Sequence, residues 1–315
     1  METTNDFDVI IIGAGAAGLS AAQMLGRSLR SVLVLDTASP RNRFAAHMHG
    51  ILGGDGLNPH DFLARGRAEA SAYGIQFRSV GATTVTETNT GLAVSTTDGD
   101  TLTARRLVAA TGVRDELPPI PGLAEGWGRD VLHCPYCHGW EVRGRRLGVL
   151  ATSPMGLHQA HLIRQWSEDV VFLSADAGPV DDGVARTLGS RGVVIEPRRV
   201  TEVTRNDAGA LTGVRLADGD EVALDAIFTA GQLHPNDAYL DGLGLERDEM
   251  PFGSFIHADF TGKTSNPRVF AAGNITSPMA NVPISMSAGT MAGSMVNMDL
   301  VTEDFDLATE RIDAA

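Results

Sequence analysis

Short apolar runs alternate along the first part of the chain with segments of helical periodicity. Residues 8–12 form a run rich in β-branched side chains, which is typical of a parallel strand buried on both faces. A glycine-rich turn follows, then a helical segment at about residues 19–27 and a second apolar run at residues 31–35. This order predicts a strand–helix–strand unit with parallel strands.

The turn after the first strand reads Gly13-Ala-Gly-Ala-Ala-Gly18, and the second strand is followed by Asp36. The three glycines suit a tight turn, close approach of the backbone to a pyrophosphate, and close helix–strand packing. Free N–H groups and the dipole at the helix start favour phosphate. Asp36 is placed to accept hydrogen bonds from an adenosine ribose. Together these positions predict a dinucleotide site rather than an ordinary glycine-rich turn.

The apolar pattern continues and is then interrupted. Asn58-Pro59 predicts the start of a helix that ends near residue 73, and residues 106–110 predict a strand that closes at Thr111-Gly112. The pattern then breaks at a cluster of prolines, which marks a domain boundary. The prolines are Pro118, Pro119 and Pro121, and Gly122 follows them.

A second α/β pattern occupies about residues 122–228, with strands at 147–151 and 170–173 around a helix at 156–166. Beyond residue 235 the chain rejoins the first domain, and it ends in a helix over residues 285–300.

The 315 residues favour two domains over one. We therefore expect an α/β protein with two Rossmann-like three-layer domains. The first is discontinuous, with residues 1–117 and 233–315, and the second is inserted at residues 118–232.

Charge and the N-terminal sequence exclude several classes of partner. The net charge is −14 and Lys263 is the one lysine, so a nucleic-acid partner, which requires a basic face, is not expected. The acidic start of the chain lacks the basic and apolar regions of a signal peptide. Since no apolar run approaches the roughly 18–20 residues that span a bilayer, no membrane association is expected either. We expect a cytoplasmic protein.

The two cysteines stand in the sequence Cys134-Pro135-Tyr136-Cys137. A disulfide between residues so close together would close a small loop and stabilise little, so a redox-active or metal-binding pair is the better interpretation. No second cysteine pair is present, and a cluster completed by His133 and His138 is too compact for the usual separated zinc ligands. We therefore predict thiol–disulfide chemistry and no metal.

At this point the motifs resemble those of the low-molecular-weight thioredoxin reductase family, over essentially the whole chain. They are GAGAAG at 13–18, ATG at 110–112, CPYC at 134–137 and AAGN at 271–274. Within the family, the sequence from Cys134 to Glu141 is most similar to the FAD-dependent dithiol oxidases of gliotoxin- and holomycin-type metabolites. The resemblance implies FAD as the cofactor, a homodimer, and Cys137 as the sulfur nearer the flavin.

The chain departs from the reductases of this family at the second nucleotide site. Their second glycine fingerprint is replaced here by a stretch that contains Ala151, Ser153 and Pro154, and Pro154 removes one backbone N–H from the loop. Their histidine–arginine–arginine motif, which recognises the 2′-phosphate of NADPH, becomes Ser174-Ala175-Asp176. Asp176 would repel that phosphate, although it could hold an NAD ribose. We expect a degenerate NADPH-type domain.

Two further departures concern the reaction site and the flavin. His138 stands where the reductases have an aspartate acid–base, as it does in the dithiol oxidases, and Asn274 replaces the aspartate that holds the FAD ribityl chain. A histidine titrates near neutral pH, so His138 is our first candidate for the base, with His133 as its partner or substitute. Either histidine could instead only orient its neighbours.

Most residues predicted to bind FAD come from the resemblance. The loop after the second strand brings Arg43 and His49 near the cofactor, and backbone groups before the final helix face the flavin pyrimidine ring. The complete predicted set is Gly13, Gly15, Ala16, Ala17, Gly18, Asp36, Arg43, His49, Ala110, Thr111, Gly112, Gly273, Asn274, Val282 and Ile284.

Three functions fit these residues. The first is a dithiol oxidase, in which a small-molecule dithiol and O₂ give a disulfide and H₂O₂ through the cysteine pair. The second is a reductase that takes electrons from NAD(P)H or a protein donor. The third is a flavin-bearing redox sensor with no fast turnover. The lost nucleotide motifs favour the oxidase.

Overall fold

The computed structural model describes residues 6–314, which divide by internal contacts into two compact units. The first unit comprises the chain up to Arg43, His60–Arg114 and the chain from Leu233 onward. The second comprises Phe44–Pro59 and Asp115–Gln232. The sequence predicted one insertion at residues 118–232, and the structure additionally groups the segment Phe44–Pro59 with the second unit.

The first unit contains a seven-stranded sheet in which β3, β2, β1, β6, β5 and β4 follow one another and β19 pairs with β6. Strands β1, β2, β3, β6 and β19 pair in parallel, while β4–β5 and β5–β6 pair antiparallel. The strands are β1 Asp6–Ile12, β2 Val32–Leu35, β3 Gln76–Arg78, β4 Ala82–Glu87, β5 Leu92–Thr96, β6 Thr101–Ala109 and β19 Val269–Ala271.

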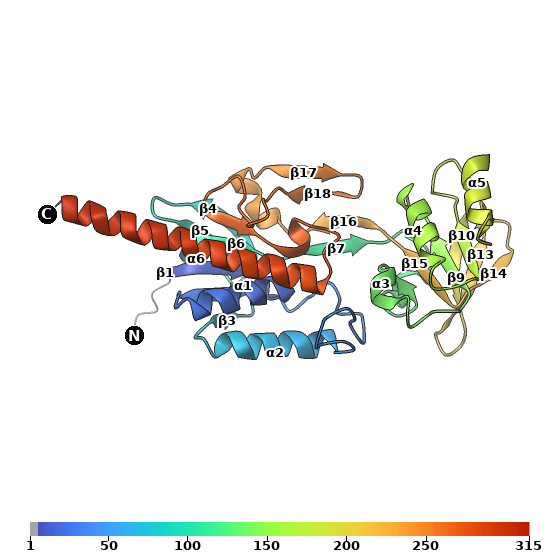
Figure 1. Ribbon diagram of the computed structural model, residues 1–315, viewed down its shortest axis with the longest axis horizontal. Helices are drawn as coiled ribbons and strands as arrows, with labels where there is room; N and C mark the ends of the chain where they lie inside the picture. Colours follow the sequence, from blue (N-terminus) through green and yellow to red (C-terminus); the bar gives the residue numbers. More distant parts are fainter. Residues whose placement is uncertain (1–5, 315) are drawn as a thin grey trace. The chain divides into compact units, whose positions relative to one another are not determined.

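Both faces of this sheet are covered. Val9 and Ile11 of β1 lie in one core with helix α1, Ala16–Arg27, and helix α6, Val282–Asp313. Ile10 and Ile12 lie in a second core on the opposite face. Since successive strand residues point to opposite faces, burial on both sides explains the uninterrupted apolar run. Helix α6 packs along α1, as Figure 1 shows.

Shorter elements complete the first unit. They are α2 Pro59–Ser71, the 3₁₀ helices η2 Ala238–Leu243 and η3 Gly273–Ile275, and the hairpin of β17 Arg247–Met250 and β18 Gly253–Ile256. The chain passes between the units in β7 Val113–Glu116 and β16 Gln232–Pro235, which form a two-stranded sheet.

The second unit repeats this architecture on a smaller scale. A parallel sheet in the order β11-β10-β9-β15-β8 has one core on each face, and a three-stranded antiparallel sheet, β12-β13-β14, contributes to one of these cores. The strands are β8 Val131–Leu132, β9 Leu147–Leu150, β10 Val170–Leu173, β11 Val194–Glu196, β12 Val200–Arg205, β13 Leu211–Leu216, β14 Glu221–Ala223 and β15 Ala226–Thr229. The helices are η1 Ala124–Gly126, α3 Pro135–His138, α4 Met155–Ile163 and α5 Asp182–Gly189.

The predicted α/β class with Rossmann-like sheets is confirmed. The expected final helix was too short, because the structure extends it from residue 300 to Asp313. None of the helices in the described part of the chain combines the length and the hydropathy that crossing a bilayer requires.

Candidate active site

The glycine turn between β1 and α1 has the geometry of a phosphate cradle. Gly13 has a φ of 101°, and a Cβ there would lie 2.5 Å from the Ala110 carbonyl oxygen. A Cβ on Gly18 would overlap the Gly13 carbonyl, so this glycine allows α1 to approach the strand. At Gly15, in contrast, a Cβ would meet no protein atom within 4 Å. The open space lies at the start of α1, where N–H groups face a ligand, so the turn fits a dinucleotide pyrophosphate.

Asp36 follows β2 and is held in place at the edge of this turn. Its Oδ1 accepts a hydrogen bond from the Ala14 N–H at 3.2 Å. Its Oδ2 accepts one from Arg67 Nη2 at 2.8 Å, and the Arg67 guanidinium lies over the Phe77 ring. The carboxylate is therefore held at the edge of the glycine turn, and its contact with the ribose stays a prediction. Arg67 was missed from sequence, since nothing in its local pattern marks it.

The Ala110-Thr111-Gly112 turn closes the strand β6 beside the glycine turn. The Ala110 N–H donates to the Ile12 carbonyl at 2.8 Å, which joins the ends of the two neighbouring strands. Thr111 Oγ1 donates to the Asn236 carbonyl at 2.7 Å, and Asn236 Nδ2 donates to the Thr111 carbonyl at 3.1 Å. The turn thus connects three chain segments of the first unit.

Asn274 follows Gly273, whose φ is 85°. The Asn274 side-chain Nδ2 donates to the carbonyl oxygens of Ser277, Pro278 and Ala280 at 3.0, 3.2 and 2.9 Å. An aspartate could make none of these bonds, because a carboxylate only accepts. The replacement of the family's aspartate therefore has a structural role, since it ties down the loop before α6.

The start of α6 is capped by a side chain. Asn281 is the N-cap, and its Oδ1 accepts from the Ile284 N–H at 3.2 Å. This bond occupies the Ile284 donor that the sequence offered to the flavin, so Val282 is the better placed of the two predicted backbone contacts. Arg43 lies earlier in the chain, where its Nη1 donates to the Pro40 carbonyl at 3.0 Å. Both assignments toward FAD stay predictions.

The cysteine pair lies in the second unit and is oxidised. Cys134 and Cys137 form a disulfide with a Cα–Cα distance of 5.2 Å. Cys134 is the N-cap of α3, and Cys137 lies inside this short helix. Both cysteines are half-buried.

His133 directly precedes the disulfide and has a defined orientation. Its Nδ1 lies 3.4 Å from the Thr229 carbonyl oxygen, and its own carbonyl accepts from Gln159 Nε2 at 3.0 Å. A carbonyl oxygen only accepts, so Nδ1 carries the proton in this arrangement. The lone pair of the neutral ring is therefore on Nε2.

His138 ends helix α3, one residue after Cys137. Burial lowers the pKa of His138, and the nearby rings of His49 and His133 lower it further, whereas the Glu141 carboxylate raises it. The neutral ring, which can accept a proton, is thus favoured at neutral pH.

His49 also belongs to this cluster. Its Nε2 lies 3.4 Å from Glu141 Oε1, and its Nδ1 lies 3.3 Å from Asp55 Oδ1. The sequence assigned His49 to FAD, which stays a prediction, and it did not reveal the contact between His49 and Glu141. The loop that carries His49 is far from residue 141 in the sequence, so local pattern gave no signal for it.

Comparison with known proteins places this geometry in a family. Residues 7–293 match the model of the pyridine nucleotide-disulphide oxidoreductases. The chain belongs to this family. The thioredoxin reductase tcpT of Claviceps purpurea is 33% identical to this oxidoreductase over 96% of the chain and 97% of tcpT. The thioredoxin reductase sirT of Leptosphaeria maculans is 31% identical over 95% of each chain.

Solved structures agree with this assignment. The crystal structure of HlmI superposes on the oxidoreductase with a TM-score of 0.93 and 41% identity, over 100% of this chain and 98% of HlmI. An oxidoreductase from Agrobacterium tumefaciens gives a TM-score of 0.89 and 37% identity, over 94% and 99%. The resemblance to thioredoxin reductases is confirmed. The protein is an FAD-binding flavoenzyme of the thiol–disulfide oxidoreductase type.

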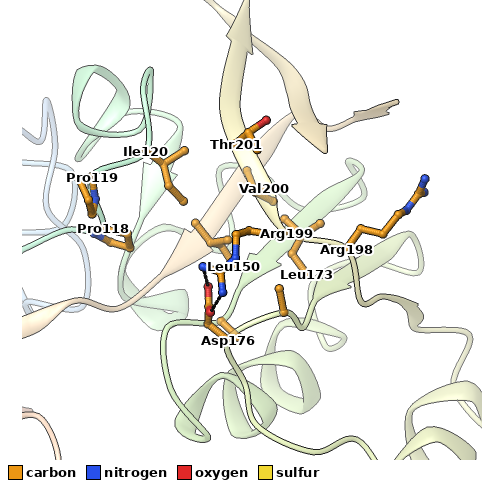
Figure 2. A pocket seen from close by; sticks show the side chains of 12 residues that line it. Pro118, Pro119, Ile120, Leu150, Leu173, Asp176, Arg198, Arg199, Val200 and Thr201 are labelled. Carbon is orange, nitrogen blue, oxygen red and sulfur yellow. Dashed lines mark hydrogen bonds and ion pairs between the residues drawn. The ribbon is translucent and has the colours of Figure 1, made fainter. Parts of the chain in front are cut away.

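The second unit of the oxidoreductase has a cavity of about 320 Å³ at the carboxyl ends of β9 and β10. Asp176 and Arg199 pair across it through bonds of 2.8 and 3.2 Å, while Arg198 extends away from them (Figure 2). Arg198 pairs with acidic side chains instead, at 2.7 Å each. These are Glu196, Asp218 and Asp220.

This cavity does not fit a nucleotide 2′-phosphate. Both of its arginines are already neutralised by carboxylates, and Asp176 would repel a further anion. Pro154 is the N-cap residue of α4 and has no N–H to offer a phosphate. Within residues 6–314, no group of three or more histidine, cysteine or acidic side chains could hold a metal ion.

Proposed function

We propose that the protein is an FAD-dependent dithiol oxidase. A small-molecule dithiol is oxidised to its disulfide at Cys134–Cys137, and O₂ accepts the electrons and gives H₂O₂. One observation carries the proposal. The second unit keeps a disulfide beside His138, whose pKa is lowered by burial, while its nucleotide cavity is lined by paired charges that disfavour NADPH.

The cysteine pair performs the oxidation in two exchanges. One substrate thiolate attacks Cys134, which breaks the Cys134–Cys137 bond and releases Cys137 as a thiolate. The second substrate thiol then attacks the substrate sulfur bound to Cys134, so the product disulfide forms and Cys134 leaves as a thiolate. The substrate loses two electrons and two protons, and the cysteine pair gains the two electrons. FAD held by the glycine turn and Asp36 would supply a two-electron acceptor for the reduced pair, from which the electrons would reach the terminal acceptor.

Histidine supplies the proton transfer. Neutral His138 takes the proton of the second substrate thiol, and the burial that lowers its pKa keeps it ready to do so at neutral pH. His133, whose Nδ1 lies 3.4 Å from the Thr229 carbonyl oxygen, is the proposed partner or substitute of His138. Both rings lie within the segment that carries the disulfide.

A reductase is the alternative, and the family itself favours it. Relatives of this chain are named thioredoxin reductases. Both side chains of the Asp176–Arg199 ion pair are exposed to solvent, so breaking the pair would cost about 1 kcal/mol or less. Asp176 would then be available for an NAD ribose. Homodimer formation and a cytoplasmic location are further expectations from the sequence.

Substitution of Cys137 tests the electron route. We expect Cys137→Ser to keep FAD bound and to lose the anaerobic bleaching of the flavin by dithiols, because no disulfide is left to pass electrons onward. Cys134→Ser should also lose bleaching by dithiols, since the attacked sulfur is gone. Normal bleaching in either variant would show that the electrons take another route.

A further inference from the structure

Two large aromatic side chains next to the disulfide are exposed. Tyr136 lies between the cysteines and is 73% exposed, and Trp140 is 65% exposed. Large aromatic side chains are normally at least half-buried, because their area is the most costly to leave in water. Residues 135–139 have helical backbone, so Tyr136 and Trp140 are four residues apart on one side of the turn.

Both rings are held by contacts with neighbouring side chains. The Tyr136 ring packs edge-on against Trp166, with centroids 5.6 Å apart and an interplanar angle of 87°. Gly139 lets Trp166 approach, since a Cβ there would lie 2.8 Å from the Trp166 ring. The Arg143 guanidinium stacks on the Trp140 ring at 3.9 Å from its centroid and donates to the Trp140 carbonyl. Fixed, exposed rings lose little entropy when a ligand covers them.

The sequence directly after Trp140 is more basic than the chain as a whole. The net charge is −14, yet the stretch after Trp140 contains Arg143 and Arg145, both exposed, and one acidic residue, Glu141. A dithiol reacts as its thiolate, so a positive field favours the reacting form. The surface therefore matches a ligand that is planar and anionic.

From these contacts we infer that Tyr136 and Trp140 form an aromatic platform that determines substrate specificity. It binds the ring of a small aromatic or heteroaromatic dithiol and places one sulfur at Cys134. This inference rests on the proposed dithiol reaction and adds the substrate class and the residues that recognise it. Neither side chain takes part in the electron transfer.

Two dithiols that close to disulfide rings of the same size separate recognition from chemistry. Dithiothreitol is aliphatic, and 1,2-benzenedimethanethiol carries an aromatic ring. Anaerobic stopped-flow bleaching of the flavin in the holoenzyme gives the half-saturating concentration of each. We expect Trp140→Ala and Tyr136→Ala each to raise this value about three- to tenfold for the aromatic dithiol and less than twofold for dithiothreitol, as expected for loss of an aromatic contact.

Matched variants show whether the rings themselves matter. Tyr136→Phe keeps the ring and should behave like the wild type, as should Phe260→Ala, which removes an exposed aromatic residue of the first unit. Equal changes for both dithiols, or none, would refute the platform. So would an unchanged value for the aromatic dithiol together with weaker reaction of reduced thioredoxin, which would mark a protein-docking surface.

A binding measurement separates the platform from the proposed function. The closed aromatic disulfide needs no electron transfer, and calorimetry can measure its affinity for the holoenzyme. If the closed disulfide binds more weakly to Trp140→Ala than to the wild type, the platform is supported. If in addition no dithiol bleaches the flavin, the oxidase function is refuted and the platform is not. Equal binding to both proteins would overturn the platform alone.

Discussion

At the scale of single residues, the three glycines of the first turn differ in what they tolerate. Gly13 and Gly18 are required by the fold, because any side chain there would collide with backbone. Gly15 faces open space at the start of α1 and has an ordinary negative φ of −73°. We therefore infer that the missing side chain leaves room for the pyrophosphate of FAD.

We predict that Gly15→Ala folds normally and weakens FAD binding by at least about tenfold, which corresponds to about 1.4 kcal/mol. The added methyl group lies where the pyrophosphate approaches the backbone. Fluorescence titration of the apoprotein with FAD measures the affinity, and circular dichroism checks the fold. Gly18→Ala is the contrasting variant, since it should lower the stability of the apoprotein itself. Unchanged FAD affinity in Gly15→Ala would contradict this cradle.

Glu141 provides a test of the base. Burial and two histidines lower the pKa of His138 while the Glu141 carboxylate raises it, so Glu141→Gln should lower that pKa further. His138 acts as a base only when its ring is neutral. A lower pKa keeps the ring neutral down to a lower pH. The acidic limb of the limiting rate of flavin reduction should therefore move to lower pH.

The control for this experiment is Glu168→Gln, because the Glu168 side chain is 95% exposed and lies outside the histidine cluster. We expect its pH profile to match the wild type. A limb that stays in place in Glu141→Gln, or moves to higher pH, would remove His138 from the role of base.

At the scale of elements, the sequence predicted the central strands and helices of both domains. It missed features that depend on contacts with residues far away in the chain, such as the length of helix α6. The β1–α1–β2 unit follows from periodicity and glycine spacing. Helix α6 was expected to stop at residue 300, where the apolar repeat ends. It continues because the following residues contain no glycine or proline, and because acidic side chains there pair with arginines of distant segments.

The same reason limits the prediction of the site. The glycines, the cysteines and His138 belong to local motifs, so the sequence alone was enough to single them out as candidates. The partners of Asp36, His49 and Asp176 were not, because each ion pair joins segments that only the fold brings together. Charge pairs of this kind leave no periodic signal in the sequence.

Asp304 on the extended part of α6 pairs with Arg30 at 2.8 Å and with Arg105 at 2.6 Å. We predict that Asp304→Asn lowers the free energy of unfolding by about 1 kcal/mol at neutral pH and low salt, since both arginines lose a partner. Urea denaturation measures this loss, and 1 M salt should reduce it.

The pH dependence of this contribution has a defined sign. Hydrogen bonds from Arg30, the largest favourable effect, and from Arg105 lower the pKa of Asp304 in the folded protein. The stabilisation is therefore complete above the ordinary pKa of an aspartate and is lost as the pH falls through the lower, folded value. If the wild type and Asp304→Asn were equally stable at neutral pH, the two ion pairs of Asp304 would contribute nothing to stability.

At the scale of the whole molecule, two units of similar architecture have diverged in their nucleotide sites. The first keeps an open glycine turn with a fixed acid after β2, which suits FAD. The second keeps the sheet and a cavity, but this cavity is lined by the Asp176–Arg199 ion pair. Under the proposed function, electrons therefore enter through Cys134 and Cys137 rather than from NADPH.

Anaerobic titration of the holoenzyme, followed by flavin absorbance, tests this claim most directly. A small dithiol should bleach the flavin stoichiometrically, and admission of O₂ should restore the colour with release of H₂O₂. NADPH and NADH at the same concentration should leave the spectrum unchanged, while dithionite confirms that the flavin is reducible. Rapid bleaching by NADPH, with little or none by dithiols, would contradict the account.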